Sequence, residues 1–352
     1  MQSKHQPQSI LVTGGAGFIG SNFIKYILQT DSTIRVINLD LLTYAGSIDN
    51  LSGLPDSTRY TFVEGDICNQ NLVRNIFNKH NIDTIVHFAA ESHVDRSIDG
   101  PATFVTTNVL GTFTLLECAK EFWGASINGV NFDKAVRFHH ISTDEVFGEL
   151  SSDDKAFTED SCYLPSSPYS ASKASSDHFV RAYQRTYGLP ATITNCSNNY
   201  GPNQNWEKFI PTIIKACVEE TAIPVYGDGS NVRDWLYVED HCRGIDAVLR
   251  YANNGETYNI GGNTELSNNE VVQKVCSVMD ECLSRSYRHQ ELISFVKDRP
   301  GHDIRYAMDA SRIGMDLNWF PQEQFVAGIR KTVNWYIERA QSARQNNLDK
   351  TQ

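Results

Sequence analysis

The sequence lacks any hydrophobic run long enough to cross a membrane, and it lacks an excess of positive charge. No stretch approaches about eighteen consecutive apolar residues, and the first nine residues are polar, without the apolar core of a secretory signal. Acidic residues number 42 against 31 lysines and arginines, so the formal net charge is −11. Nucleic acid and anionic membrane surfaces would repel such a chain. We therefore expect a cytoplasmic protein that binds neither.

The cysteines also lack a functional pattern. Eight are present, but none forms a CxxC pair or a paired Cys/His motif. This arrangement is not typical of a zinc site. We expect reduced, mostly packed thiols and no metal. Internal repeats and low-complexity linkers are absent too, and 352 residues leave one or two domains as the expectation.

Short apolar runs alternate with longer amphipathic stretches in the first half of the chain. The runs are Ile10–Thr13, Arg35–Leu39, Tyr60–Val63, Thr84–Phe88 and Val136–Ile141, and the first is followed by an amphipathic stretch over Phe18–Leu28. Strands that alternate with helices indicate a parallel sheet covered on both faces, which is a doubly wound α/β fold. Ligands of such sheets bind beyond the carboxyl ends of the strands. We expect Gly14, Asp40, Asp66, Ala89 and Ser142 to converge there.

The pattern becomes mixed beyond about residue 195, where glycine-containing turn signals recur. We expect a nucleotide-binding domain over 9–195, to which parts of 230–260 are candidates to return. A smaller substrate-binding lobe would occupy 196–340, with 307–340 largely helical. The polar segments 1–8 and 341–352 are expected to be frayed tails.

A glycine pattern, Gly14-Gly-Ala-Gly17-Phe-Ile-Gly20, follows the first predicted strand and opens the first predicted helix. Glycines allow a tight turn and close backbone approach, and the start of the helix can receive a pyrophosphate. Asp40 ends the next strand, where it can accept a hydrogen bond from the adenosine ribose and repel a 2′-phosphate. This favours NAD over NADP. The alternative is a structural turn beside an exposed aspartate.

Tyr169 and Lys173 are four residues apart and lie on one helical face if Pro168 opens a helix. The ammonium would then lie beneath the phenol and lower its pKa. Ionising a phenol at neutral pH requires roughly 4 kcal/mol of electrostatic stabilisation. Such a spacing is common, however, and by itself it is weak evidence of catalysis.

Asp144 and Glu145 follow Ser142 and Thr143 at the end of a predicted strand. An isolated acidic pair is usually a solvated turn. Upstream of Tyr169, the pair is better interpreted as a general acid and a general base that hold opposite protonation states. Neighbouring side chains on a strand point in opposite directions, so this interpretation requires a turn directly after Ser142.

The glycine turn, Asp40 and the Tyr169–Lys173 pair resemble those of the extended short-chain dehydrogenases/reductases, which have the Rossmann fold. Longer blocks are similar to the dTDP-glucose 4,6-dehydratase family within that group. These blocks are Ala89–Ser97, Ser142–Gly148, Tyr169–Asp177, Asn195–Pro202, Arg233–His241 and Asp298–His302. The resemblance extends from about residue 9 to 337. It implies NAD, a dTDP-glucose substrate, and a homodimer joined through helices near 103–122 and 169–187.

The resemblance also implies residue roles. Tyr169 would take the proton of the sugar C4 hydroxyl, with Lys173 and Thr143 assisting. Glu145 would remove the C5 proton and Asp144 would protonate the departing C6 hydroxyl. The expected cofactor residues are Gly14, Gly17, Phe18, Ile19, Gly20, Asp40, Leu41, Leu42, Thr43, Asp66, Ile67, Phe88, Ala89, Ala90, Ser92, Thr107, Tyr169, Lys173 and Asn199. The expected substrate residues are Ser92, Thr143, Asn198, Lys208, Pro224, Tyr226, Arg233, Asn268, Arg299 and His302.

Two positions depart from that family. Phe147 stands where a tyrosine is usual, and Asn203–Trp206 replaces an aromatic-rich loop, so we expect the sugar pocket to differ in detail from that of the family. Three other functions fit part of this pattern. A sugar-nucleotide 4-epimerase would not need the acid pair, and a GDP-mannose dehydratase commonly uses the NADP that Asp40 disfavours. A non-catalytic NAD-binding regulator would be expected to have lost either the Tyr169–Lys173 pair or the Asp144–Glu145 pair.

Overall fold

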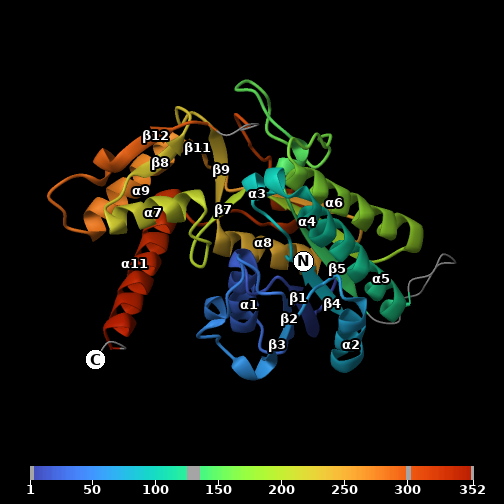
Figure 1. Ribbon diagram of the computed structural model, residues 1–352. Helices are drawn as coiled ribbons and strands as arrows, with labels where there is room; N and C mark the ends of the chain where they lie inside the picture. The colour runs from blue at the N-terminus through green and yellow to red at the C-terminus, as the bar shows by residue number, and fades with distance from the viewer. Residues whose placement is uncertain (1–3, 125–134, 299–302, 350–352) are drawn as a thin grey trace.

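The seven-stranded sheet at the centre of this computed structural model is parallel throughout and carries helices on both faces (Figure 1). The structure describes residues 4–124, 135–298 and 303–349. The strand order is β10-β6-β5-β4-β1-β2-β3. The doubly wound α/β fold predicted from the sequence is confirmed. The strands are β1 (Ser9–Thr13), β2 (Arg35–Asp40), β3 (Tyr60–Glu64), β4 (Thr84–His87), β5 (Arg137–Thr143), β6 (Ala191–Cys196) and β10 (Thr257–Ile260).

The central strands are buried on both faces and run in register with one another. All residues of β1, β4, β5 and β6 are buried, as expected for strands with helices on both faces. Leu11 on β1 is paired with Ile37 on β2 and with Ile85 on β4. These pairings bring the carboxyl ends of the strands to one edge of the sheet.

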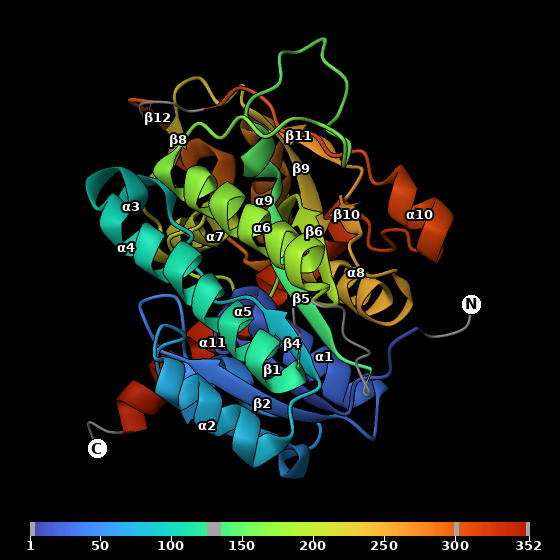
Figure 2. The same ribbon diagram turned by 90° about the vertical axis from the view of Figure 1, so that its right-hand side faces the viewer.

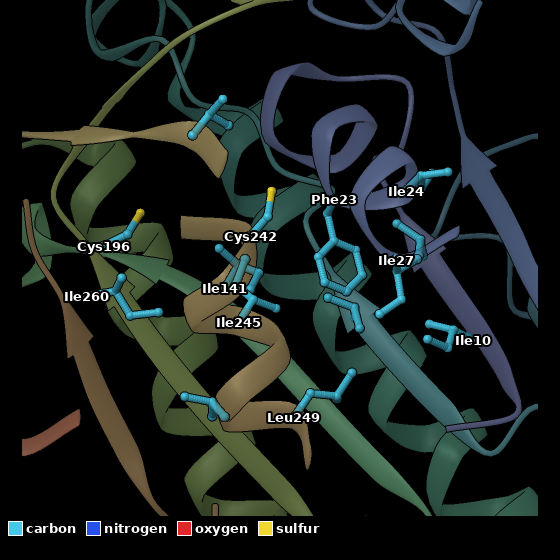
Figure 3. Packing of buried hydrophobic residues seen from close by; sticks show 14 of the residues in the cluster. Ile10, Phe23, Ile24, Ile27, Ile141, Cys196, Cys242, Ile245, Leu249 and Ile260 are labelled. Carbon is cyan, nitrogen blue, oxygen red and sulfur yellow. The ribbon is translucent and has the colours of Figure 1, made fainter. Parts of the chain in front are cut away.

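Helices α1 (Phe18–Thr30) and α8 (Val238–Tyr251) pack together on one face of the sheet. Figure 3 shows Phe23 and Ile27 of α1 close to Ile245 and Leu249 of α8, all fully buried. The opposite face is covered by α2 (Gln70–His80), α5 (Thr112–Trp123) and α6 (Pro168–Tyr187), whose buried residues share a second core (Figure 2). The segment before α5 contains α3 (Val94–Asp99), α4 (Pro101–Phe104) and the π-helical η3 (Val105–Gly111).

A second group of elements lies beyond one end of the sheet and has its own core (Figure 1). Two small sheets belong to it, with the strand orders β11-β9-β7 and β12-β8. The division of domains at residue 196 stays a prediction. This group comprises β7 (Asn198–Tyr200), α7 (Phe209–Glu219), β8 (Ile223–Tyr226), β9 (Val232–Tyr237), β11 (Glu265–Ser267), α9 (Asn268–Cys282), the 3₁₀ turn η5 (His289–Leu292), β12 (Ile293–Val296) and α11 (Phe325–Asp349). Further 3₁₀ turns outside this group are η1 (Ile48–Leu51), η2 (Ser57–Arg59) and η4 (Asp144–Phe147).

The predicted terminal segments differ from the structure. Residues 4–8 are not frayed, because the backbone N–H groups of Lys4 and His5 donate to the Arg250 carbonyl, and the buried His5 ring contacts Thr84 Oγ1 at 2.7 Å. At the other end, α11 continues to Asp349. Within 307–340, a non-helical segment separates α10 (Ser311–Leu317) from α11.

Two further properties of the described residues bear on function. Within these ranges, no helix combines the length and the apolar character that spanning a membrane requires. The same ranges hold no cluster of three or more histidine, cysteine or acidic side chains arranged to hold a metal ion. The eight cysteines are free thiols.

Candidate active site

The strand ends meet around one cavity of about 320 Å³. Gly14, Asp40, Asp66, Ala89 and Ser142 all line it, so the residues expected at this edge lie together. Most of the expected cofactor residues line it as well. These are Gly17, Phe18, Ile19, Gly20, Leu41, Thr43, Ile67, Phe88, Ala90, Ser92, Thr107, Tyr169, Lys173 and Asn199. Leu42 is the exception, because it packs against the core beside β2.

The turn after β1 leaves no room for a side chain at Gly14 or Gly20. Gly14 has a φ of +71°, and a Cβ there would lie 2.6 Å from the Ala89 nitrogen. A Cβ on Gly20 would lie 2.4 Å from the Gly14 carbonyl oxygen. Gly17 precedes α1, and no side chain caps this helix start. The first N–H groups of α1 can therefore bind an anionic group in the cavity, as a dinucleotide pyrophosphate requires.

Asp40 connects the turn to the loop after β2. Its Oδ2 accepts from Ala16 N and its Oδ1 from Leu42 N, each at 2.8 Å. These bonds orient a buried carboxylate at the cavity wall. Carboxylate oxygens have further acceptor sites for ribose hydroxyls, and the negative charge disfavours a 2′-phosphate. The residues present thus fit NAD.

Tyr169 and Lys173 lie in the first turns of α6, which starts at Pro168 as predicted. A capping box between Ser167 and Ser170 fixes this start. Lys173 Nζ donates to the Ile141 carbonyl oxygen at 2.7 Å. Both side chains are buried, and both line the cavity.

The net pKa shift of Tyr169 is upward, opposite to the direction expected from a neighbouring ammonium. Burial, followed by the Glu145 carboxylate, raises the pKa of Tyr169 well above its usual value, although a hydrogen bond with Thr143 opposes this. Burial therefore favours the neutral phenol, while the Lys173 ammonium donates to the Ile141 carbonyl oxygen. Ionising it requires additional positive charge in the cavity.

The acid pair lies on the turn that ends β5. β5 continues to Thr143, and the 3₁₀ turn η4 starts at Asp144, one residue later than the sequence argument required. Thr143 caps this turn, since its Oγ1 accepts from Glu145 N at 3.3 Å and donates to Asp144 Oδ1 at 3.1 Å. Through this turn Asp144 and Glu145 both line the cavity.

Asp144 is 2% exposed. Burial and then the neighbouring Glu145 raise its pKa to about 8. Its Oδ2 has no hydrogen-bond partner among the described residues. A carboxylic acid in this environment keeps its proton at neutral pH and can donate it to a ligand.

The expected substrate residues fall into three groups. Ser92, Thr143, Asn198 and Lys208 line the cavity, and Lys208 Nζ donates to the Ser92 carbonyl oxygen at 3.1 Å. Arg233, Pro224, Tyr226 and Asn268 lie on β9, on β8 and at the start of α9, outside its lining. Arg299 and His302 lie outside the described residues.

Several residues around the cavity were not predicted from the sequence. Tyr44, His93 and Glu207 line it, and Arg96 connects two of the loops that carry them. The Arg96 guanidinium donates to Glu207 at 2.7 Å and lies 3.8 Å from the Tyr44 ring centroid. These residues lie within or next to recognised motifs, but no local pattern indicates that their loops meet.

The departures from the family pattern also have a place in the structure. Phe147 is buried, with its ring centroid 5.1 Å from Phe157 and 5.1 Å from Tyr163. It is not part of the cavity lining. In the Asn203–Trp206 loop, Asn205 lines the cavity and donates to the Tyr44 carbonyl oxygen at 3.1 Å. The second departure therefore lies closer to a ligand than the first.

Comparisons with known proteins agree with this geometry. A family model described as GDP-mannose 4,6 dehydratase matches residues 11–332. The dTDP-glucose 4,6-dehydratase of Shigella flexneri is 53% identical over 336 residues, which cover 93% of this chain and 92% of that protein.

Two solved structures are similarly close. The dTDP-glucose 4,6-dehydratase of Streptomyces venezuelae has a TM-score of 0.84 at 44% identity, covering 94% of this chain and 97% of that chain, and was solved with NAD bound. The Bacillus anthracis enzyme, also solved in complex with NAD, has a TM-score of 0.83 at 42% identity with the same coverage.

The fold and the cavity define an extended short-chain dehydrogenase/reductase, with a nucleotide-binding glycine turn and a tyrosine–lysine pair at one sheet edge. Within that class, the chain belongs to the dTDP-glucose 4,6-dehydratase family. This confirms the resemblance that the sequence motifs indicated.

The raised pKa of Asp144 predicts how stability changes with pH. A group whose folded-state pKa lies above its unfolded value of 3.8 contributes stability at low pH, and this contribution is lost as pH rises towards 8. We expect Asp144→Asn to be more stable than the parent protein by about 6 kcal/mol at pH values above the folded-state pKa, because each unit of the pKa shift corresponds to about 1.4 kcal/mol. The difference should vanish near pH 4. Chemical denaturation over this range tests it, and a parent protein as stable as the variant at high pH would contradict the assignment.

Proposed function

We propose that the protein converts dTDP-glucose to dTDP-4-dehydro-6-deoxy-glucose and water, using NAD held at the glycine turn. The observation that carries this proposal is the pair Asp144–Glu145 in the same cavity as Tyr169, with Asp144 kept protonated by burial. Oxidation and re-reduction at one carbon would need only Tyr169, Lys173 and the cofactor. A protonated acid beside a second carboxylate suits loss of water.

The cofactor assignment rests on this chain's own turn and on its relatives. Gly14, Gly17, Gly20 and Asp40 would hold NAD, and two relatives of known structure contain it. NAD, when bound, supplies a carrier that accepts a hydride from the sugar C4 and returns one at C6. Its positive charge would also favour ionised Tyr169, which the protein alone does not.

The first chemical task belongs to Tyr169. Its phenolate oxygen takes the proton of the C4 hydroxyl as hydride leaves C4, and Thr143 holds the same sugar oxygen by a hydrogen bond. Lys173 stabilises the phenolate. The product of this step is a 4-ketone, which makes the neighbouring C5 proton acidic because the resulting carbanion is delocalised into the carbonyl group.

The acid pair then expels water. Glu145 takes the C5 proton, and Asp144 protonates the C6 hydroxyl as the C6–O bond breaks. When hydride reaches C6, Glu145 returns its proton to C5. Tyr169 gains one proton and Asp144 loses one, so the total number of protons on the enzyme is unchanged. The net products are the keto sugar and one water molecule.

The decisive assay incubates the pure protein with dTDP-glucose and follows the alkali-induced absorbance of a 4-keto sugar. We expect this product, and GDP-mannose in place of dTDP-glucose should give none. A dTDP-linked 4-epimer would show that the site is an epimerase. Turnover of GDP-mannose alone would support the other dehydratase.

Glu145→Gln separates oxidation from elimination. The variant should still generate reduced cofactor when substrate is added, while the 6-deoxy product falls by about 100-fold or more, because no base removes the C5 proton. Cofactor absorbance and product chromatography measure the two steps. Glu219→Gln, on the exposed end of α7, serves as a matched control and should behave as the parent. Product formation at the parent rate in the Glu145 variant would overturn this role.

We further propose a homodimer joined through η3, α5 and α6, in a protein that acts in the cytoplasm. Figures 1 and 2 show α5 and α6 side by side on the outside of the molecule. Four large apolar side chains are exposed on these elements, namely Val105, Leu110, Phe113 and Phe179. The ring centroids of Phe113 and Phe179 lie 6.1 Å apart, so the exposed rings of α5 and α6 form one apolar patch across the two helices.

A charge placed in this patch should separate the subunits. We expect the parent protein to have the mass of a dimer in light scattering and Phe113→Glu to have that of a monomer, because a buried unpaired carboxylate is costly. Met315 is a more exposed apolar side chain on α10, away from this patch, and Met315→Glu should leave the mass unchanged. A monomeric parent protein would contradict the proposal.

A further inference from the structure

Asp177 is a fully buried carboxylate that belongs to no part of the cavity lining. It lies on α6 four residues after Lys173, which is itself four residues after Tyr169. Side chains at this spacing share one helical face. Asp177 therefore extends the face that carries Tyr169 and Lys173, but on the side away from the substrate.

Three groups hold this carboxylate. Ser142 Oγ donates to Asp177 Oδ2 at 2.7 Å and Tyr163 OH donates to the same oxygen at 2.8 Å. His140 Nε2 lies 3.1 Å from Oδ1. Burial raises the pKa of Asp177, but His140, the charge of Lys173 and the hydrogen bond from Ser142 together outweigh it, so this pKa lies below its usual value. An ionised carboxylate in this interior needs a cation nearby.

Lys173 is that cation. Its Nζ lies 3.5 Å from His140 Nε2, the same nitrogen that lies 3.1 Å from Asp177 Oδ1, so one edge of the imidazole lies between the ammonium and the carboxylate. Burial lowers the pKa of Lys173, and the charge of Asp177 raises it. Burial and then Lys173 lower the pKa of His140 to about 4, so the imidazole is a neutral spacer at neutral pH.

The other titratable groups around this site are neutral or more remote. His87 on β4 faces His140 with ring centroids 5.2 Å apart, and burial holds its pKa well below the usual value. Cys196 on β6 is buried, and this raises the pKa of its thiol. Tyr169 keeps its proton for the same reason. Arg181 on α6 contacts Tyr163 OH at 2.9 Å rather than Lys173.

We propose that Asp177 is the internal counter-ion of Lys173 and a positioning residue for the reaction, acting through the neutral His140. It keeps the ammonium charged and directed towards β5 beneath Tyr169, without touching the substrate. The proposal rests on the role assigned above to Lys173. It adds a third position, eight residues after the tyrosine, to the functional face of α6.

The first test is the pH profile of turnover in the complete enzyme with dTDP-glucose. In Asp177→Asn, loss of the carboxylate should lower the pKa of Lys173, so the alkaline limb of kcat should move to lower pH by about one unit or more. Tyr163→Phe removes one hydrogen bond to the same oxygen but keeps the charge, and its alkaline limb should stay in place. An unshifted limb in Asp177→Asn, or an equal shift in Tyr163→Phe, would overturn the proposal.

The second test does not depend on activity. We would measure unfolding temperatures of Asp177→Asn, Lys173→Met and the double variant at neutral pH. Each single variant leaves one buried charge without its partner, so each should unfold at a lower temperature than the parent. The double variant should lose less unfolding temperature than the sum of the losses in the two single variants. Additive losses would show that the two residues do not act as a pair, whatever the reaction proves to be.

Discussion

The turn that ends β5 is the constraint on which the site depends. In a strand, Asp144 and Glu145 would point to opposite faces of the sheet, and only one could reach a ligand. Because Thr143 caps a 3₁₀ turn at this point, both carboxyl groups line the same cavity as Tyr169. Without this turn, the fold would hold a cofactor and a tyrosine but no elimination chemistry.

Burial then assigns the protonation states. The interior raises the pKa of Asp144 to about 8 and raises the pKa of Tyr169 well above its usual value. These shifts mean that the surroundings of the cavity disfavour negative charge on Asp144 and Tyr169. Ligands that bring positive charge would change the balance, so binding and chemistry are coupled through the same low-dielectric environment. The raised pKa of Asp144 lowers the stability of the fold at neutral pH, and the same raised pKa keeps a proton available in the cavity.

Much of this could be predicted from sequence because the decisive signals are local. The glycine turn, the strand that ends at Asp40 and the start of α6 at Pro168 each depend on neighbouring residues, and the structure has all three. Contacts between distant segments were missed for the opposite reason. Nothing near Arg96 indicates that it contacts Glu207, and nothing near His5 indicates that it packs against Thr84.

The pKa of Tyr169 also could not be predicted from local sequence. Helical spacing correctly places Lys173 on the face of Tyr169, but spacing contains no information about burial or about Glu145. Burial and Glu145 raise the pKa of Tyr169, so the predicted direction of its net shift was wrong. The counter-ion Asp177 was equally hidden, since its role depends on His140, which comes from another element.

The central claim is that Asp144 carries a proton at neutral pH while it faces the cavity. Infrared difference spectroscopy between the parent protein and Asp144→Asn measures this directly. The account predicts a protonated-carboxyl C=O band in the parent at pH 7 that disappears as pH rises through about 8 and is absent from the variant. A parent spectrum that shows only ionised carboxylate for this residue at pH 7 would contradict it.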